Sequence, residues 1–80
     1  PSAGCVFRNP PEGLSAGALV EKAGFKGARE GGAVVSEVHA NYIVNAGGAT
    51  AADVLRLMER LQNGVREAFG VELHPEIQLW

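Results

Sequence analysis

The side chains best suited to chemistry lie at opposite ends of this 80-residue sequence, Cys5 near the start and Glu76 near the end. A thiol has a reference pKa of about 8.5, so Cys5 could donate a proton near neutral pH or act as a nucleophile beside a base. Glu76 belongs to a polar series, with Glu72, His74 and Gln78, that alternates with apolar residues. The thiol and the carboxylate can act together only if the fold brings both ends of the chain to one place.

Each candidate also has a purely structural interpretation. A lone cysteine is commonly a small buried hydrophobic residue, and Glu76 can be a solvated surface carboxylate. His39 and His74 could bind an anion or accept a hydrogen bond, but their spacing is not that of a metal site, and we predict no bound metal. Asn9 is typical of a turn and Arg8 of a surface cation.

Composition excludes several classes of partner. A net charge of −2 gives no electrostatic reason to expect nucleic acid or an anionic membrane as a partner. Apolar runs are short and interrupted, well below the roughly 18 residues that span a bilayer. A single cysteine cannot form an internal disulfide, which favours a reducing cytoplasm.

The length predicts one small domain over residues 1–80. Such a chain buries about 60–65% of the surface that its unfolded form exposes, near the lower limit for independent stability. It begins at Pro1 without Met and ends at Trp80 within an apolar alternation. We therefore expect a piece cut from a longer protein.

The first half predicts a strand over residues 5–8, a proline turn and a helix capped by Ser15 and stopped by Gly24. Residues 25–32 are rich in glycine and indicate an irregular link, although the N–H groups of its glycine pair could in principle face a phosphate. Residues 33–36 and 42–45 are rich in β-branched and aromatic side chains, which favours two further strands.

The second half predicts a long helix over residues 50–69, with Thr50 and Asp53 as a capping box and Gly70 as its end. Gly64 inside it costs about 1 kcal/mol against alanine and could permit a bend. Apolar residues repeat along one face of the helix at helical spacing: Val54, Leu57, Met58, Leu61, Val65 and Ala68. The tail alternates with period two, and Pro75 within it indicates either an edge strand or two short strands with a kink. We expect an α+β domain, a small and largely antiparallel sheet with two helices packed on one face.

Three segments, in the same order and spacing, resemble one family. Residues 2–10 are similar to a motif of glycine, serine or cysteine, any residue, phenylalanine, a basic residue, asparagine and proline. The family's central block is resembled by residues 15–17, 23–27, 32–36, 39–41 and 43–45, and its ending by residues 69–73 and 75–77. The sequence is identified as similar to the C-terminal substrate-binding domain of UDP-N-acetylenolpyruvoylglucosamine reductase.

The resemblance implies part of a cytoplasmic bacterial flavoenzyme of peptidoglycan synthesis, an oxidoreductase of cell-wall formation. NADPH reduces FAD, and hydride then passes to the enolpyruvyl double bond of a UDP-sugar, UDP-N-acetylglucosamine enolpyruvate. It also implies that the FAD-binding domains lie upstream, outside this chain, so that the isolated domain would be inactive.

The resemblance further assigns roles to single residues. Cys5 takes the position of the proton donor, where many members have serine, and Glu76 takes that of the catalytic glutamate. Asn9 matches a substrate-binding asparagine. His39 aligns with a substrate-contacting position that is often glutamine, and Arg8 takes a basic position that could hold phosphate or carboxylate.

Two other functional classes stay open on the residues alone. One is a non-catalytic module that binds a nucleotide-sugar or another protein. The other is a thiol hydrolase that pairs Cys5 with His39, although no nucleophile motif surrounds the cysteine.

Overall fold

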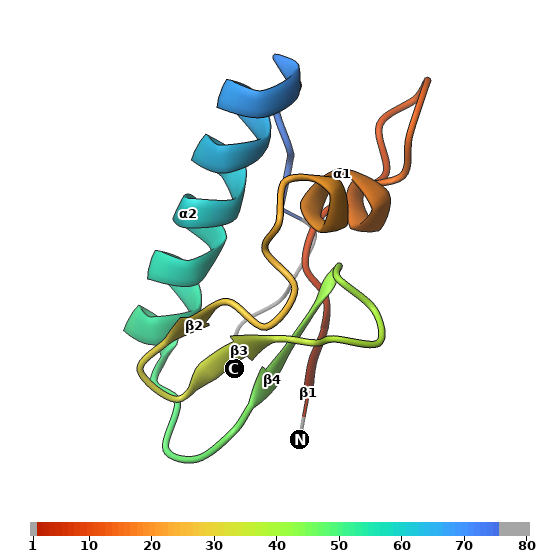
Figure 1. The fold of residues 1–80 in the computed structure, drawn as a ribbon. Coiled ribbons are helices and arrows are strands. Elements are labelled where there is room, and N and C mark those ends of the chain that lie inside the picture. The colour runs from red at the N-terminus through yellow and green to blue at the C-terminus, as the bar shows by residue number, and fades with distance from the viewer. Residues whose placement is uncertain (1, 76–80) are drawn as a thin grey trace.

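Within residues 2–75, which the computed structural model describes, four strands form one antiparallel sheet in the order β1-β4-β3-β2 (Figure 1). Of residues 2–5 only the backbone is described. The elements are β1 (Ser2–Cys5), α1 (Ala16–Lys22), β2 (Arg29–Glu30), β3 (Ala33–Val35), β4 (Tyr42–Asn45) and α2 (Ala51–Phe69). The α+β class predicted from the sequence is confirmed.

Both helices and the sheet contribute to one buried core. Helix α2 contacts β2 and β3, and α1 packs against α2. The predicted stripe of α2 supplies the largest share, with Leu57, Met58, Leu61 and Val65 buried, whereas Ala68 at its end is exposed. The other buried apolar residues are Val6, Phe7, Ala16, Leu19, Val20, Ala33, Val35, Ala40, Ile43 and Leu73.

The helix boundaries follow the capping signals in the sequence. The Thr50 hydroxyl accepts a hydrogen bond from the Asp53 N–H, while the Asp53 carboxylate accepts one from the Thr50 N–H, each at 3.1 Å. Gly70 ends α2 in the left-handed conformation, with φ of 68°. At α1, the Ser15 hydroxyl accepts from the Ala18 N–H at 3.2 Å. No helix within residues 2–75 is both long and apolar enough to cross a membrane.

Gly64 has a packing role in α2, which continues as one α-helix through this position. A methyl group built on Gly64 would collide with the ring of Phe25, which lies against the core from the segment after α1. The missing side chain thus makes room for an aromatic ring, and this explains a residue that lowers helix propensity.

Two strands differ from the expectation. The sequence predicts strand over residues 5–8, but β1 is Ser2–Cys5, and Phe7 joins only an isolated bridge. The link predicted over residues 25–32 contains β2, which pairs with β3 through a two-glycine turn. Arg60 of α2 fixes this edge, since its guanidinium donates to the Arg29 carbonyl at 2.8 Å and to the Glu30 carboxylate at 2.9 Å.

The chain returns after α2 to lie beside its own beginning (Figure 1). Phe7 and Pro75 form an antiparallel bridge, and the Arg8 N–H donates to the His74 carbonyl at 2.9 Å. On the other side of the tail, the Gln62 amide of α2 donates to the Leu73 carbonyl at 3.1 Å. Residues 71–74 keep the predicted alternation of burial but form no strand, and Pro75 joins only the isolated bridge. The rest of the predicted tail strand lies outside the described residues.

Candidate functional site

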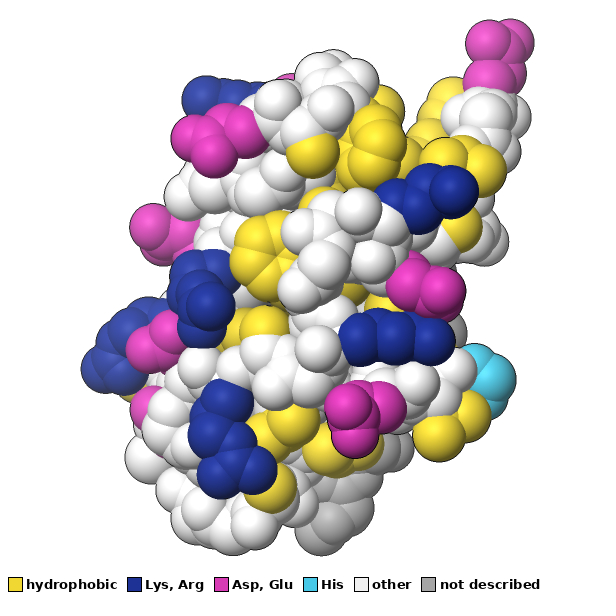
Figure 2. All heavy atoms as spheres, in the orientation of Figure 1, with side chains coloured by type: hydrophobic (Ala, Val, Ile, Leu, Met, Phe, Trp, Pro, Cys, Tyr) yellow, Lys and Arg dark blue, Asp and Glu magenta, His cyan; other side chains and the backbone are white. Residues whose placement is uncertain are grey.

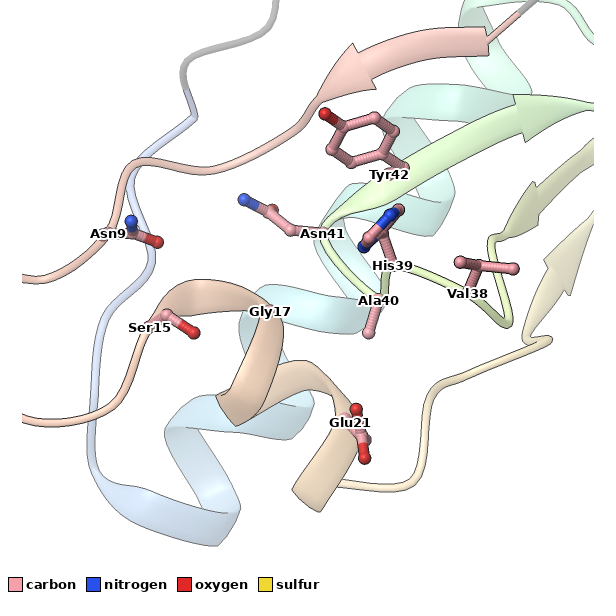
Figure 3. A pocket seen from close by; sticks show the side chains of 9 residues that line it. All are labelled: Asn9, Ser15, Gly17, Glu21, Val38, His39, Ala40, Asn41 and Tyr42. Carbon is pink, nitrogen blue, oxygen red and sulfur yellow. The ribbon is translucent and has the colours of Figure 1, made fainter.

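An open groove of about 340 Å³ lies between α1 and the connection from β3 to β4 (Figure 3). The segment that follows β1 and the first residue of β4 complete its walls. The lining residues are Asn9, Ser15, Gly17, Glu21, Val38, His39, Ala40, Asn41 and Tyr42. This volume is within the range of small-molecule sites, and the groove brings together two residues predicted from distant parts of the sequence, Asn9 and His39.

Asn9 is fixed at the start of α1. Its Oδ1 accepts a hydrogen bond from the Ala16 N–H at 3.1 Å, next to the N-cap residue Ser15. Asn9 thus binds the first N–H of α1 from seven residues away, which differs from the local turn role expected from the sequence. Because the carbonyl oxygen is engaged with the backbone, the Nδ2 donor is the group that Asn9 can direct at a ligand.

His39 and Tyr42 form an aromatic pair on the opposite wall. Their ring centroids are 5.4 Å apart with an interplanar angle of 43°. A tight turn holds them together, because the His39 carbonyl accepts from the Tyr42 N–H at 2.9 Å and the His39 N–H donates to the Ser36 hydroxyl at 3.2 Å. Both residues are exposed, so this wall offers a ring face and polar ring edges to a ligand.

Asn41 lies between these two walls in the close-up view (Figure 3). Its side-chain amide contacts Phe7, two residues from Asn9, through a pair of hydrogen bonds. Sequence reasoning did not select Asn41 as a site residue, because the partner of its side chain, Phe7, lies 34 residues away in the sequence. The signal that could have found it is its place in the same short segment as His39.

The groove has no formal positive charge of its own, since neither Lys nor Arg is among its lining residues. Glu21 at its rim is paired with Lys26 at 3.1 Å. Elsewhere in the described part, basic and acidic side chains are interspersed over the face shown in Figure 2, as in the Arg60–Glu30 pair. Negative groups of a ligand would need a cation from outside the groove lining.

The groove is adjacent to the backbone of Cys5. Cys5 is the last residue of β1, and its Cα partner across the sheet is the groove residue Tyr42. The Cys5 side chain is not described, and Glu76 lies outside the described residues. Its neighbour Pro75 pairs with Phe7, so the backbone runs that carry the two predicted catalytic residues approach each other. Arg8 is exposed and is not part of the groove lining.

Residues 1–80 match the family described as UDP-N-acetylenolpyruvoylglucosamine reductase, C-terminal domain. The chain belongs to this family. The reductase of Desulfosudis oleivorans is 55% identical over 78 residues, which cover 98% of this chain and 25% of that protein. Reductase 2 of Symbiobacterium thermophilum is 58% identical over 80 residues, 100% of this chain and 26% of that protein.

A solved structure from the same family has the same fold. The crystal structure of the Thermus caldophilus reductase aligns with a TM-score of 0.79 and 48% sequence identity, over 99% of this chain and 27% of that chain. The chain thus spans about a quarter of the length of these relatives. The resemblance noted from the three sequence segments is confirmed at the level of the family.

Proposed function

We propose that this chain is the substrate-binding domain of an NADPH-dependent reductase that acts on UDP-N-acetylglucosamine enolpyruvate in bacterial cell-wall synthesis. The observation that carries the proposal is that the segment after β1, which helps to line the groove, is paired with the segment after α2. Cys5 pairs with the groove residue Tyr42, and Phe7 pairs with Pro75. A proton donor on one run and an acid on the other would then face one ligand.

The overall reaction adds one hydride and one proton to the enolpyruvyl double bond, and NADPH becomes NADP⁺. FAD held by the preceding part of the enzyme would supply the hydride to the outer vinyl carbon. Electron density then passes to the neighbouring carbon and its carboxylate, so that carbon needs a proton. Cys5 would supply this proton, so that a C–H bond forms as the S–H bond breaks. The thiolate would then recover a proton from water.

Glu76 would polarise the substrate carboxylate or orient the proton donor. Two carboxylates at close range repel each other unless one is protonated or a cation lies between them. Arg8 could provide such a cation for carboxylate or phosphate, because it lies between Phe7 and Asn9 and its side chain is exposed. The groove lining contains neither Lys nor Arg, so a cation for the substrate's negative groups has to come from outside it, as Arg8 would.

Asn9 and His39 would bind the polar part of the substrate from opposite walls. The Nδ2 of Asn9 is a donor for an oxygen of the ligand, and its position is fixed by the bond from Oδ1 to α1. His39 would contribute a ring nitrogen, with its ring supported by Tyr42. The groove thus suits a neutral, polar portion such as a sugar.

The described residues do not suit FAD or a metal. The two-glycine turn between β2 and β3 is not open to a phosphate, because the Gly32 N–H donates to the Asp53 carboxylate at 3.4 Å. A Cβ on Gly32 would collide with the β4–α2 loop at Gly47 and Ala49, so the turn is packed from that side. No metal-binding group of three His, Cys, Asp or Glu residues occurs in the described part of the chain. We assign FAD to the upstream domains, and a cytoplasmic location follows from the proposed pathway.

The test is a hybrid enzyme in which this chain replaces the matching C-terminal segment of the Thermus caldophilus reductase. Flavin reduction by NADPH reports on the host part. Reoxidation of the reduced flavin by UDP-N-acetylglucosamine enolpyruvate reports on this chain, and we expect turnover. If NADPH reduces the flavin normally but the substrate does not reoxidise it, the proposal is wrong.

The same material separates the rival classes. A thiol hydrolase would lose a flavin-independent activity on alkylation of Cys5. A binding module would hold the nucleotide-sugar with the same affinity in the wild type and in the Cys5→Ala and Glu76→Gln variants, and none of the three would support reoxidation.

A further inference from the structure

The side chain of Asn41 pairs with a backbone residue far away in the sequence. Its Oδ1 accepts from the Phe7 N–H at 3.0 Å, and its Nδ2 donates to the Phe7 carbonyl at 2.9 Å. A primary amide has one acceptor and one donor group side by side, as a strand neighbour presents them, so it can satisfy both backbone groups of one residue. The Asn41 carbonyl also accepts from the Val6 N–H at 2.9 Å.

These bonds continue the sheet where regular pairing stops. The pairing of β1 with β4 ends at Cys5 and Tyr42, and its register is irregular. From that point Asn41 takes over from β4 and holds the chain through Val6 and Phe7. Phe7 is 1% exposed, so without the Asn41 side chain its backbone N–H and carbonyl groups could not reach water unless the core were disturbed.

Phe7 in turn connects the parts of the proposed site. Cys5 lies two residues before it, and Asn9 lies two residues after it. Across from it, Pro75 forms the bridge that leads into Glu76. Phe7 is therefore the backbone residue that lies between Cys5 and Asn9 and pairs with Pro75, and Asn41 is the side chain that holds it.

We propose that Asn41 is a positioning residue for proton transfer, acting through Phe7. This inference rests on the proposed function. Reacting groups that lie about 1 Å out of place can slow an enzyme about 100-fold. Loss of the Asn41 amide should therefore slow the proton-transfer half of the reaction more than it weakens substrate binding.

Asn45 provides a matched control at the other end of β4. Its Oδ1 accepts from the Gly47 N–H at 2.9 Å and from the Ala49 N–H at 3.1 Å, so it also makes two side-chain bonds to backbone. These bonds shape the β4–α2 loop, and Asn45 does not line the groove. A purely structural role for asparagine predicts similar behaviour for both alanine variants.

The experiment uses the hybrid enzyme with Asn41→Ala, Asn41→Asp and Asn45→Ala. At saturating substrate we expect Asn41→Ala to slow flavin reoxidation about 10-fold or more. The substrate concentration that gives half of the maximal rate should change by a factor of about three at most. The solvent deuterium isotope effect on reoxidation should rise, because proton transfer becomes limiting. NADPH-driven flavin reduction should be unchanged, and Asn45→Ala should leave both half-reactions unchanged.

Asn41→Asp keeps the acceptor for the Phe7 N–H and loses the donor to its carbonyl, so we expect an intermediate rate. This variant decides the question if the alanine variant does not fold. Equal rates for Asn41→Ala and Asn45→Ala, or a change confined to half-saturation, would overturn the inference. Failure of the unmodified hybrid to reoxidise the flavin would instead count against the proposed function.

Discussion

Phe7 and Pro75 are paired in an isolated antiparallel bridge, so that residues near the two ends of the sequence lie side by side. The pairing is supported on both sides. Asn41 holds Phe7 through its side-chain amide, and Gln62 holds the tail through the Leu73 carbonyl. Our predictions concern this arrangement, the chemistry proposed for it and the helix that supports it.

The first prediction concerns Cys5 in the hybrid enzyme. Cys5→Ala should reduce the rate of flavin reoxidation by substrate about 10²- to 10⁴-fold, the usual range for loss of a general acid. Reduction of the flavin by NADPH should stay normal, because it precedes substrate protonation. Cys5→Ser should retain substantial activity, as a hydroxyl can occupy the same position. Stopped-flow absorbance of the flavin measures each half-reaction, and fast reoxidation in Cys5→Ala would remove Cys5 from the mechanism.

The second prediction concerns Gly64 and Phe25. Glycine to alanine in a helix normally stabilises by about 1 kcal/mol, but here the new methyl group would meet the Phe25 ring. We expect Gly64→Ala to lower the free energy of unfolding by about 1–3 kcal/mol, as in other overpacked sites. Denaturant unfolding of the chain measures it.

The control for this prediction is the same Gly64→Ala change made in a protein that already carries Phe25→Ala. With the ring removed, the Gly64→Ala change should become neutral or stabilising, because only the gain in helix propensity remains. The double-mutant cycle should thus give a large interaction energy between the two positions. Additive effects would show that the ring does not restrict this position.

The third prediction concerns Gln62 and the tail. Gln62→Ala removes the donor to the Leu73 carbonyl, and one such bond contributes about 0.5–1.5 kcal/mol. Local opening of the tail should become more frequent. Hydrogen exchange of the Arg8 N–H, whose acceptor is the His74 carbonyl, should then accelerate.

The control is Asn63→Ala, one position along α2 on its exposed surface. It should leave exchange at Arg8 unchanged. Equal exchange rates in the two variants would mean that Gln62 does not anchor the tail.

The fourth prediction concerns the pH dependence of stability at Asp53. Hydrogen bonds from the backbone N–H groups of Thr50 and Gly32 are the main cause that lowers the pKa of Asp53. A carboxyl group whose pKa is lower in the folded state stabilises the fold above its unfolded pKa of about 3.9. That contribution is lost as the pH falls through the lower folded-state value.

Asp53→Asn keeps a side-chain oxygen but cannot ionise. The wild type should therefore be more stable than the variant at pH 6, and the difference should narrow at pH 3. Denaturant midpoints of both proteins at the two pH values provide the measurement. A constant difference between them would contradict a titrating role for Asp53.

Local signals in the sequence predicted much of the fold. Thr50, Asp53 and Gly70 fix the ends of α2 through bonds within a few residues, and Ser15 does so for α1. The strand over residues 42–45 was also predicted with correct bounds. For the helix ends the determining contacts are local, so the residue types are sufficient evidence. For the strand, the β-branched and aromatic residue types were sufficient, although its pairing partners are distant in the sequence.

The missed features depend on contacts between distant residues. Strand β2 is the polar pair Arg29–Glu30, and it is held by Arg60 from α2. In the site, Asn9 and His39 were predicted through the family resemblance, and the structure places both in one groove. Asn41 was missed because its partner Phe7 is far away in the sequence, and no local pattern indicates such a pair.

The Phe7–Pro75 bridge also bears on how the protein is made. During translation, Phe7 leaves the ribosome long before its bridge partner Pro75 has been added to the chain. Until then the apolar side chain of Phe7 lacks part of its native packing. Contacts between residues that are distant in the sequence also form slowly. The nascent chain is therefore expected to complete its fold, and with it the proposed site, only after the segment that follows α2 has emerged.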